Sequence, residues 1–278
     1  MKITNLQGGV DLHNGVFMPY FGLGVFLAEE GNQVEEAVTT ALDAGYIHID
    51  TASIYKNEVG VGRAVKNHDL SREELFITTK LWNTDQGYDQ SLKAFESSLK
   101  KLDTDYIDLY LIHWAVEGKY KDSWRALEKL YHEGAVRAIG VSNFTETHLL
   151  DLMETSEIVP MVNQVEFHPM LQQNALQIFC KQHKIQYEAW SPLMRGKFTQ
   201  LSEALTPIAD KYIKTIPQII LRWNLQKGIV TIPKSVNRNR ILENADIFDF
   251  YLTEEDMNVI ANLDENHRLG PDPDNFSF

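Results

Sequence analysis

Cysteine is almost absent from this chain, and so are long apolar runs. Cys180 is the single cysteine among 278 residues, so no intramolecular disulfide can form and we expect a reducing compartment, the cytoplasm. No run approaches the roughly 18 apolar residues of a membrane span, and the first residues, "MKITNLQGGVDLHNG", lack the apolar stretch of a signal peptide. The apolar spacing of "ALQIFCKQH" predicts a buried helix face for Cys180 rather than a catalytic thiol.

Basic residues are also scarce. The chain holds 26 Lys and Arg against 39 Asp and Glu, a net charge of -13. This charge repels polyanions, so we expect neither nucleic acid nor an acidic membrane as a partner. The 9 histidines lack the paired spacing of a zinc site, so we expect no metal. An anionic ligand would need a local basic cluster, and "PKSVNRNR" provides one with Lys234, Arg238 and Arg240.

Short β-rich segments alternate with amphipathic segments along the chain. The expected strands cover residues 21–26, 46–50, 75–80, 107–112, 138–142, 161–166, 186–190 and 229–233. Helical periodicity predicts helices over residues 33–45, 57–68, 91–102, 123–134, 146–156, 174–183, 217–228 and 238–248. Gly45, Gly134 and Gly228 lie where helix C-caps are expected.

This alternation favours a (β/α)8 TIM barrel of the α/β class. Eight strand–helix units demand a parallel sheet covered by helices, and no Gly/Ser/Pro-rich linker divides residues 1–278, so we expect one domain. Before the first unit, Asn14-Gly15 between extended residues predicts a type I′ β-hairpin that plugs the N-terminal mouth. After the last, "TEEDMNVIANL" predicts an extra C-terminal helix capped by Thr253, followed by an irregular tail.

A doubly wound Rossmann sheet is the competing architecture. It requires G-x-G-x-x-G between an early strand and its helix. "GLGVFL" has no third glycine, and "GVGRAV" lies inside a helical segment. The sequence therefore favours the barrel, and a cofactor would not be bound through that fingerprint.

Polar residues end most of the expected strands. In a barrel, the active site forms where the C-terminal ends of the strands meet. The residues that should converge on this rim are Asp50, Lys80, His113, Ser142, Asn143, Gln164 and Lys234. Each has a structural explanation by itself, such as a helix cap or a solvated loop residue, but a ring of them from separate strands indicates a site.

Three of these residues, Asp50, Lys80 and His113, make chemical sense together with the nearby Tyr55. A free tyrosine has a pKa near 10, so Tyr55, one loop after Asp50, is a weak acid at neutral pH. An ammonium from Lys80 would lower that pKa, and the Asp50 carboxylate would hold the ammonium in place. His113 could direct a substrate carbonyl by hydrogen bonding. The group suits proton transfer to a C=O/CH–OH pair, which also needs a hydride partner.

The sequence resembles the aldo-keto reductase family over essentially its whole length. "GYIHIDTASIYKNEVGVGRAV", "FITTKLW" and "YIDLYLIHW" are similar to the family segments around the catalytic Asp, Tyr, Lys and His. "GVSNF", "VNQVEFHP" and "IPKSVNRNRILENA" are similar to its cofactor segments. The chain is most similar to short bacterial members near the 2,5-diketo-gluconate and glyoxal or methylglyoxal reductases, partly through "GPDPDNF".

The resemblance implies a catalytic set and a cofactor, NADPH, as the hydride source. The implied catalytic residues are Asp50, Tyr55, Lys80 and His113. Ser142, Asn143 and Gln164 would hold the carboxamide and Trp190 would stack on the nicotinamide, while Lys and Arg favour a 2′-phosphate. The implied cofactor residues are Gly24, Val25, Phe26, Ser142, Asn143, Gln164, Trp190, Ser191, Leu193, Arg195, Ile232, Lys234, Ser235, Val236, Arg240, Glu243 and Asn244.

Three positions depart from the commonest family pattern. Trp190 replaces a tyrosine, Val25 a frequent threonine and Ala115 a usual proline, so the affinity and preference for the cofactor are open. Phe26, Trp82 and Trp114 would either wall an apolar substrate pocket or belong to the core. The short segment after residue 262 predicts an open pocket for small aldehydes, α-dicarbonyls or sugar-like carbonyls.

The expected function is NADPH-dependent reduction of aldehydes or ketones by a monomer, and two alternatives stay open. A barrel aldolase could use Lys80 as a Schiff base, although an ionic partner in Asp50 disfavours this. A non-catalytic regulatory subunit could bind nicotinamide on the same scaffold, because a fold alone does not establish turnover. The complete set of four catalytic residues favours the reductase.

Overall fold

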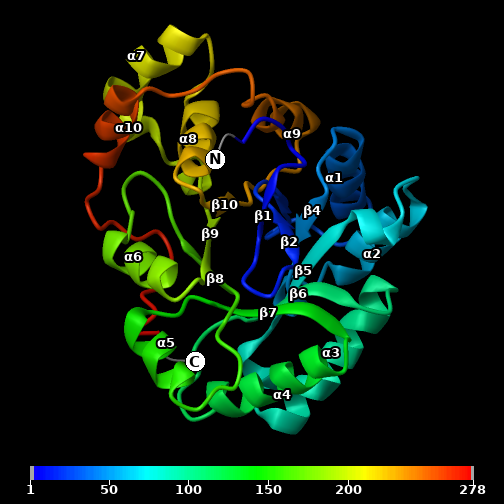
Figure 1. Ribbon diagram of the computed structural model, residues 1–278. Coiled ribbons are helices and arrows are strands. Elements are labelled where there is room, and N and C mark those ends of the chain that lie inside the picture. The colour runs from blue at the N-terminus through cyan, green and yellow to red at the C-terminus, as the bar shows by residue number, and fades with distance from the viewer. Residues whose placement is uncertain (1–2, 277–278) are drawn as a thin grey trace.

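The computed structural model describes residues 3–276 and contains eight parallel strands in sequence order. Each strand overlaps one of the eight expected segments (Figure 1). They are β3 Leu23–Gly24, β4 His48–Asp50, β5 Phe76–Leu81, β6 Ile107–Ile112, β7 Val136–Ser142, β8 Val162–Glu166, β9 Gln186–Trp190 and β10 Val230–Thr231. The strand predictions are therefore confirmed, with ends that differ by a few residues.

The sheet closes into a barrel. Its order runs from β10 through β9 down to β3, so each strand pairs with its neighbour in sequence. The two edges meet through parallel bridges between Phe21 and Thr231 and between Gly24 and Lys234. The Gly22 amide donates to the Thr231 carbonyl at 3.0 Å, and a Cβ at Gly24 would lie 2.9 Å from the Ile232 carbonyl oxygen, so glycine permits this close approach.

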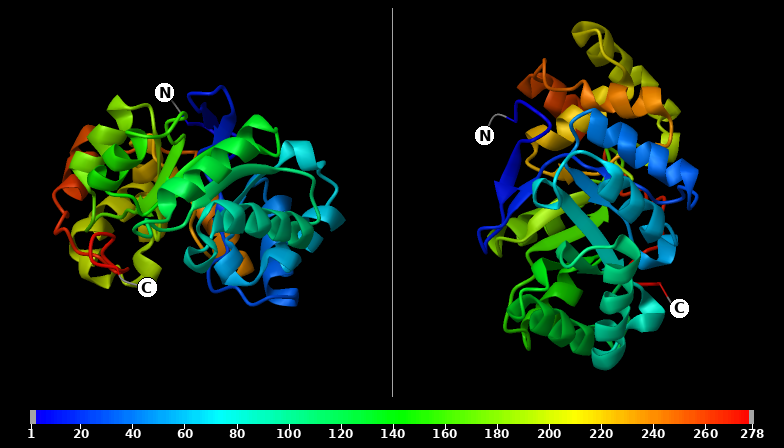
Figure 2. Two further views of the ribbon diagram at one scale, coloured as in Figure 1. Left: turned by 90° about the horizontal axis from the view of Figure 1, so that it is seen from below. Right: turned by 90° about the vertical axis from the view of Figure 1, so that its right-hand side faces the viewer.

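Helices surround the strands (Figure 2). They are α1 Asn32–Asp43, α2 Glu58–Asn67, α3 Tyr88–Leu102, α4 Tyr120–His132, α5 Glu146–Met153, α6 Asn174–Gln182, α7 Ser202–Tyr212, α8 Ile216–Gln226, α9 Arg238–Ala245 and α10 Glu254–Ala261. Gly45, Gly134 and Gly228 have the positive φ expected of C-caps, and the Thr253 hydroxyl accepts from the Asp256 amide at the start of α10. Helix α7 was not predicted; Pro207 in its interior removes a helical hydrogen bond and weakens its sequence pattern.

An N-terminal hairpin lies across the N-terminal ends of the strands. Its strands are β1 Gly9–Asp11 and β2 Phe17–Pro19. The Asn14 side chain donates to the carbonyl of Arg137 in β7 at 3.0 Å, which holds the hairpin against this face. Figure 2 shows the hairpin and the C-terminal tail on opposite faces of the molecule.

The type of the hairpin turn differs from the prediction. A type I′ turn needs positive φ at both central residues, but only Gly15 has one, at 84°. The Gly15 amide donates to the Leu12 carbonyl and the Leu12 amide to the Val16 carbonyl, which makes a three-residue loop with a glycine bulge. The Asn14 side chain is bonded to the Val16 amide and the Arg137 carbonyl, and these bonds hold Asn14 outside the left-handed region.

Polar side chains occupy part of the barrel interior. His48 and Asp50 alternate with the apolar Ile49 on β4, and all three are buried. Inside the barrel, a His48 ring nitrogen lies 3.1 Å from the Thr78 hydroxyl, and Gln164 donates to Glu188 at 3.0 Å. Two of the residues that the sequence predicts for the rim, Asp50 and Gln164, therefore belong to this buried interior layer.

Candidate active site

A buried ion pair lies at the C-terminal end of the barrel. The Lys80 ammonium, from β5, donates to the Asp50 carboxylate at 2.6 Å and to the Thr51 carbonyl at 2.9 Å. Both side chains are nearly or fully buried, at 0% and 3% exposed. Adjacent parallel strands place the two groups side by side, and the desolvated pair holds a fixed positive charge at the mouth.

Tyr55 lies beside this pair. It ends a short 3-10 helix, η1 Ser53–Tyr55, that follows β4 and stops at Lys56, whose φ is 58°. The Lys80 nitrogen is 5.1 Å from the centre of the Tyr55 ring. The centre of the His113 ring is 5.9 Å from the centre of the Tyr55 ring. The structure thus brings Asp50, Tyr55, Lys80 and His113 together from β4, η1, β5 and the end of β6.

The pKa of Tyr55 is raised rather than lowered. Burial is the largest cause and outweighs the Lys80 ammonium, which lowers the pKa in part. The lowered pKa that the sequence predicts for Tyr55 is therefore wrong. The phenol keeps its proton at neutral pH, and the ammonium lies close enough to stabilise a phenolate when that proton leaves.

The three neighbouring groups also have shifted pKa values. For Lys80, burial lowers the pKa, but the charges of Asp50 and Tyr55 and the bond to Asp50 together raise it, so the ammonium is kept. Burial raises the pKa of Asp50, against the Lys80 ammonium and the Gln164 amide, which stabilise the carboxylate. Burial, and then Lys80, hold the pKa of His113 well below its usual value. His113 is therefore a neutral imidazole, able to donate one hydrogen bond.

The ends of β7, β8 and β9 form a connected polar surface. The Asn143 side chain donates to the His113 carbonyl at 3.0 Å and accepts from the Trp190 indole N–H at 2.8 Å. Asn143 has a φ of 61°, which asparagine tolerates better than most residues. The Ser142 hydroxyl donates to the Gln164 carbonyl at 2.8 Å. The Asn143 side chain also donates to the Ser142 hydroxyl at 3.1 Å, so the five residues are held together, and Trp190 remains partly exposed.

The remaining predicted cofactor residues lie in three segments. Gly24, Val25 and Ile232 stand where β3 and β10 close the barrel, and the side chains of Val25 and Ile232 are buried. Ser191 and Arg195 have left-handed backbone in the segment after β9 that also contains Leu193. Ser235 and Val236 precede α9, which contains Arg240, Glu243 and Asn244.

The basic cluster of Lys234, Arg238 and Arg240 is exposed. None of the three forms an ion pair with another residue in the 3–276 range, whereas the Glu243 carboxylate accepts from Thr215 at 2.6 Å. Lys234 lies before α9, and Arg238 and Arg240 lie in its first turn, in a chain with a net charge of -13. This donor set fits a phosphate group.

Aromatic rings border the mouth. The Phe26 ring is 5.0 Å from Tyr55 and 44% exposed, and the Trp82 ring is 5.1 Å from His113. Trp114 is buried, and its ring lies 4.4 Å from that of Phe276. Phe26 and Trp82 thus face the mouth, and Trp114 packs against the C-terminal tail.

The sequence did not predict that the C-terminal tail folds back over the mouth. The amides of Leu269 and Gly270 donate to the Glu166 carboxylate at 2.8 and 3.0 Å. A Cβ at Gly270 would be 2.5 Å from the Trp190 ring. The tail therefore contacts the residue expected to stack on a nicotinamide. The spacing of residues in "GPDPDNF" does not indicate this contact. The sequence offers one signal for it, the carboxylate of Glu166 at the end of β8.

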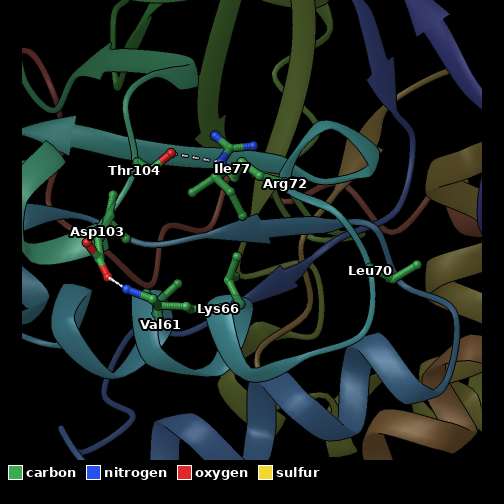
Figure 3. Close-up of a pocket in the computed structure, with 10 residues that line it drawn as sticks. Val61, Lys66, Leu70, Arg72, Ile77, Asp103 and Thr104 are labelled. Atoms are coloured by element: carbon green, nitrogen blue, oxygen red, sulfur yellow. Dashed lines mark hydrogen bonds and ion pairs between the residues drawn. The ribbon is translucent and has the colours of Figure 1, made fainter.

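A cavity of about 250 Å³ lies elsewhere, between α2, the end of α3 and the outer face of β5 (Figure 3). Its lining is largely apolar, and the Lys66–Asp103 ion pair closes one side. The Arg72 guanidinium is bonded to Thr104 and other neighbours, so its donors are already used. None of the predicted site residues lines this cavity.

Within residues 3–276, the structure shows neither a metal-binding cluster nor a membrane-spanning helix. No group of three or more His, Cys, Asp or Glu side chains is placed to hold a metal ion within that range. None of the helices found there has the length and apolar character needed to cross a bilayer. Cys180 is buried in α6, and burial raises its pKa to about 12, which suits a packing role.

Known proteins match this chain over nearly its whole length. The family model described as "Aldo/keto reductase family" matches residues 22–265. Glyoxal reductase of Bacillus subtilis (strain 168) is 58% identical over 275 residues, 99% of each chain. Methylglyoxal reductase DkgA of Escherichia coli (strain K12) is 48% identical over 270 residues, 96% of this chain and 97% of that protein. A crystal structure of a Gox0644 variant in complex with NADPH is 43% identical, with a TM-score of 0.93 and coverage of 98% and 99%.

Proposed function

Because this chain belongs to the aldo/keto reductase family and is an oxidoreductase, we propose that it reduces aldehydes or ketones to alcohols with NADPH. The main support for this proposal is the arrangement of Asp50, Lys80 and Tyr55. A buried Lys80 ammonium, paired with Asp50 at 2.6 Å, lies 5.1 Å from the centre of the Tyr55 ring at the barrel mouth. This arrangement supports a phenol that gives up a proton and is stabilised as it does so.

In the proposed mechanism, Tyr55 is the general acid. Its raised pKa keeps the proton on the phenol until a carbonyl oxygen that gains negative charge accepts it. The Lys80 ammonium then stabilises the phenolate, and Asp50 fixes the position of Lys80. Neutral His113 donates a hydrogen bond that orients the carbonyl. A reduced nicotinamide, when bound, supplies the hydride.

We assign the cofactor to the connected polar surface and the basic cluster. Ser142, Asn143 and Gln164 would hold the carboxamide, and the partly exposed Trp190 ring would stack on the nicotinamide. The unpaired cations Lys234 and Arg240 support a 2′-phosphate and hence NADPH over NADH. The NADPH complex of a protein that is 43% identical supports NADPH as the cofactor.

For substrates we propose small aldehydes, α-dicarbonyls or sugar-like carbonyls. Relatives named glyoxal reductase and methylglyoxal reductase support small α-dicarbonyls first. Phe26 and Trp82 are the proposed apolar walls beside Tyr55 and His113. We further propose that the protein is cytoplasmic and that it is a monomer; sedimentation of the purified protein would test the monomer.

The experiment is to follow NADPH absorbance with a panel of glyoxal, methylglyoxal and aldose sugars. Consumption of NADPH with at least one member supports the proposal, and binding without turnover would favour a regulatory subunit instead. Borohydride trapping of substrate on Lys80 would indicate an aldolase. The raised pKa of Lys80 disfavours that outcome, because a Schiff base requires a neutral amine.

A further inference from the structure

The proposed mechanism assigns no task to Glu188, an acid buried inside the barrel. Glu188 lies in the middle of β9, between Gln164 on β8 and Val230 on β10, and its side chain is fully buried in the barrel. Its nearest basic partner is His48, whose ring nitrogen is 3.9 Å away. Burial, and then Lys80, lower the pKa of His48 to about 3, so this ring is neutral and forms no ion pair with Glu188.

Packing alone does not explain a carboxyl group at this position. A buried acid without a cationic partner costs stability, and an apolar residue of similar volume commonly costs less. Burial, and then the charge of Asp50, raise the pKa of Glu188 to about 8. Glu188 therefore acts mainly as a neutral acid whose carbonyl oxygen can still accept a hydrogen bond.

The hydrogen bonds of Gln164 give Glu188 a role. The Gln164 side-chain nitrogen donates to the Asp50 carboxylate at 2.8 Å and to Glu188 at 3.0 Å. An amide nitrogen has two N–H groups, so both donors are used. The reversed amide would turn its oxygen toward the Asp50 carboxylate, which can only accept, and this is unfavourable. One bond to Asp50 leaves the amide free to rotate about that bond, whereas the second bond fixes its plane.

We propose that Glu188 is a positioning residue that fixes the side-chain amide of Gln164, so that the Gln164 amide oxygen is presented to accept a hydrogen bond from the carboxamide NH2 group of the nicotinamide. This inference rests on the proposed cofactor assignment. Glu188 should affect only the nicotinamide end of the cofactor, because it lies below the mouth, whereas Lys234 and Arg240 lie before and within α9.

The test compares Glu188→Met, which removes the acceptor at similar volume, with Glu188→Gln, whose amide oxygen can still accept from Gln164. Binding of NADP+ is measured by quenching of tryptophan fluorescence. The controls are 2′,5′-ADP, which lacks the nicotinamide, and the 3-acetylpyridine analogue of NADP+, which carries a methyl group in place of the carboxamide NH2. Thermal unfolding of each variant is measured in parallel.

We expect Glu188→Met to weaken NADP+ binding about three- to tenfold, the value of one hydrogen bond. Its affinity for 2′,5′-ADP should be unchanged, and its melting temperature should equal or exceed that of the wild type. The preference of the wild type for NADP+ over the acetylpyridine analogue should shrink in Glu188→Met. Glu188→Gln should bind NADP+ within about twofold of the wild type.

Two outcomes would overturn the inference alone: wild-type NADP+ affinity in Glu188→Met, or equal losses for NADP+ and 2′,5′-ADP. If Glu188→Met does not fold, Glu188→Ala carries the same test, because it removes the acceptor and adds no volume. Failure of the wild type to bind NADP+ would overturn the proposed function, and the inference with it.

Discussion

A single oxygen atom separates tyrosine from phenylalanine, so Tyr55→Phe isolates the proton donor. We expect this variant to lose about 10² to 10⁴ in turnover, or about 3 to 5 kcal/mol in the barrier, because the half-buried phenyl ring keeps its packing but has no proton to give. NADPH affinity should change by less than about twofold, since Tyr55 is not assigned to the cofactor. Initial rates with an aldehyde and a binding titration check both expectations.

The matched control for Tyr55→Phe is Tyr251→Phe. Tyr251 is 50% exposed, and its ring lies 5.0 Å from the Arg222 guanidinium, away from the proposed site. This control should keep wild-type turnover. Wild-type turnover in Tyr55→Phe itself would remove the role assigned to this residue.

Cofactor preference depends on the unpaired cations before and within α9. Replacing Lys234 and Arg240 with alanine should weaken NADPH binding far more than NADH binding, because only NADPH carries a 2′-phosphate. Affinities for both cofactors, from fluorescence titrations, give the ratio. Lys66→Ala is a suitable control, since Lys66 is exposed and paired with Asp103 beside the separate cavity. Equal losses for NADPH and NADH would contradict the 2′-phosphate assignment.

The residues at strand ends were predictable, and those inside the barrel were not. Asp50, Lys80 and His113 each follow an apolar run, and barrel geometry brings such residues to one rim. Glu188 stands inside "QYEAW", where a strand pattern does not tell lumen from surface. The raised pKa of Tyr55 was also missed, because the sequence shows that Lys80 is near but not how deeply the phenol is buried.

The contacts between the C-terminal tail and the site can be tested by adding one methyl group to the tail at Gly270. A Cβ at Gly270 would lie 2.5 Å from the Trp190 ring and 3.3 Å from the Glu166 carboxylate. We expect Gly270→Ala to displace the tail or Trp190 and so to weaken NADPH binding, with a loss of stability of about 1 to 3 kcal/mol from overpacking. Titration with NADPH and urea unfolding check the two effects.

The control for Gly270→Ala is Gly8→Ala, where the nearest atom, the Asn5 carbonyl oxygen, would be 3.3 Å from the new Cβ. It should leave NADPH affinity unchanged. If Gly270→Ala binds NADPH as the wild type does, the contact between tail and Trp190 has no part in cofactor binding.

Elements with strong periodicity were predicted, and elements that depend on tertiary contacts were not. All eight barrel strands follow from short β-rich runs, and nine of the ten helices within residues 3–276 follow from apolar residues that recur every three or four positions. The hairpin was expected, but its turn type depends on the bonds of Asn14 to Val16 and Arg137, and Arg137 is distant in sequence. The fold-back of the tail likewise depends on Glu166, which lies about a hundred residues earlier.

The barrel interior should make the stability of the protein depend on pH in two opposite ways. Glu188 binds a proton more tightly in the folded state, with a pKa of about 8, than in the unfolded chain, at 4.5. His48 binds one less tightly, with a pKa of about 3 against 6.5. Because of His48, the stability of the folded protein should therefore fall as pH drops below about 6.5. Because of Glu188, it should fall as pH rises from about 4.5 to about 8.

Glu188→Gln separates these contributions, because its amide imitates the protonated acid and does not titrate. Between pH about 4.5 and about 8 the unfolded wild type has released the Glu188 proton while the folded state retains it, so the free energy of unfolding decreases with pH. In Glu188→Gln this decrease should disappear, and the gain over the wild type should grow with pH across that range and level off above it. Urea unfolding at several pH values measures the difference in the free energy of unfolding between Glu188→Gln and the wild type. The contributions of Asp50, Lys80 and His48 cancel in this difference if their own pKa values are unchanged. A difference that does not vary with pH would mean that Glu188 is ionised in the folded protein across that range, as it is in the unfolded chain.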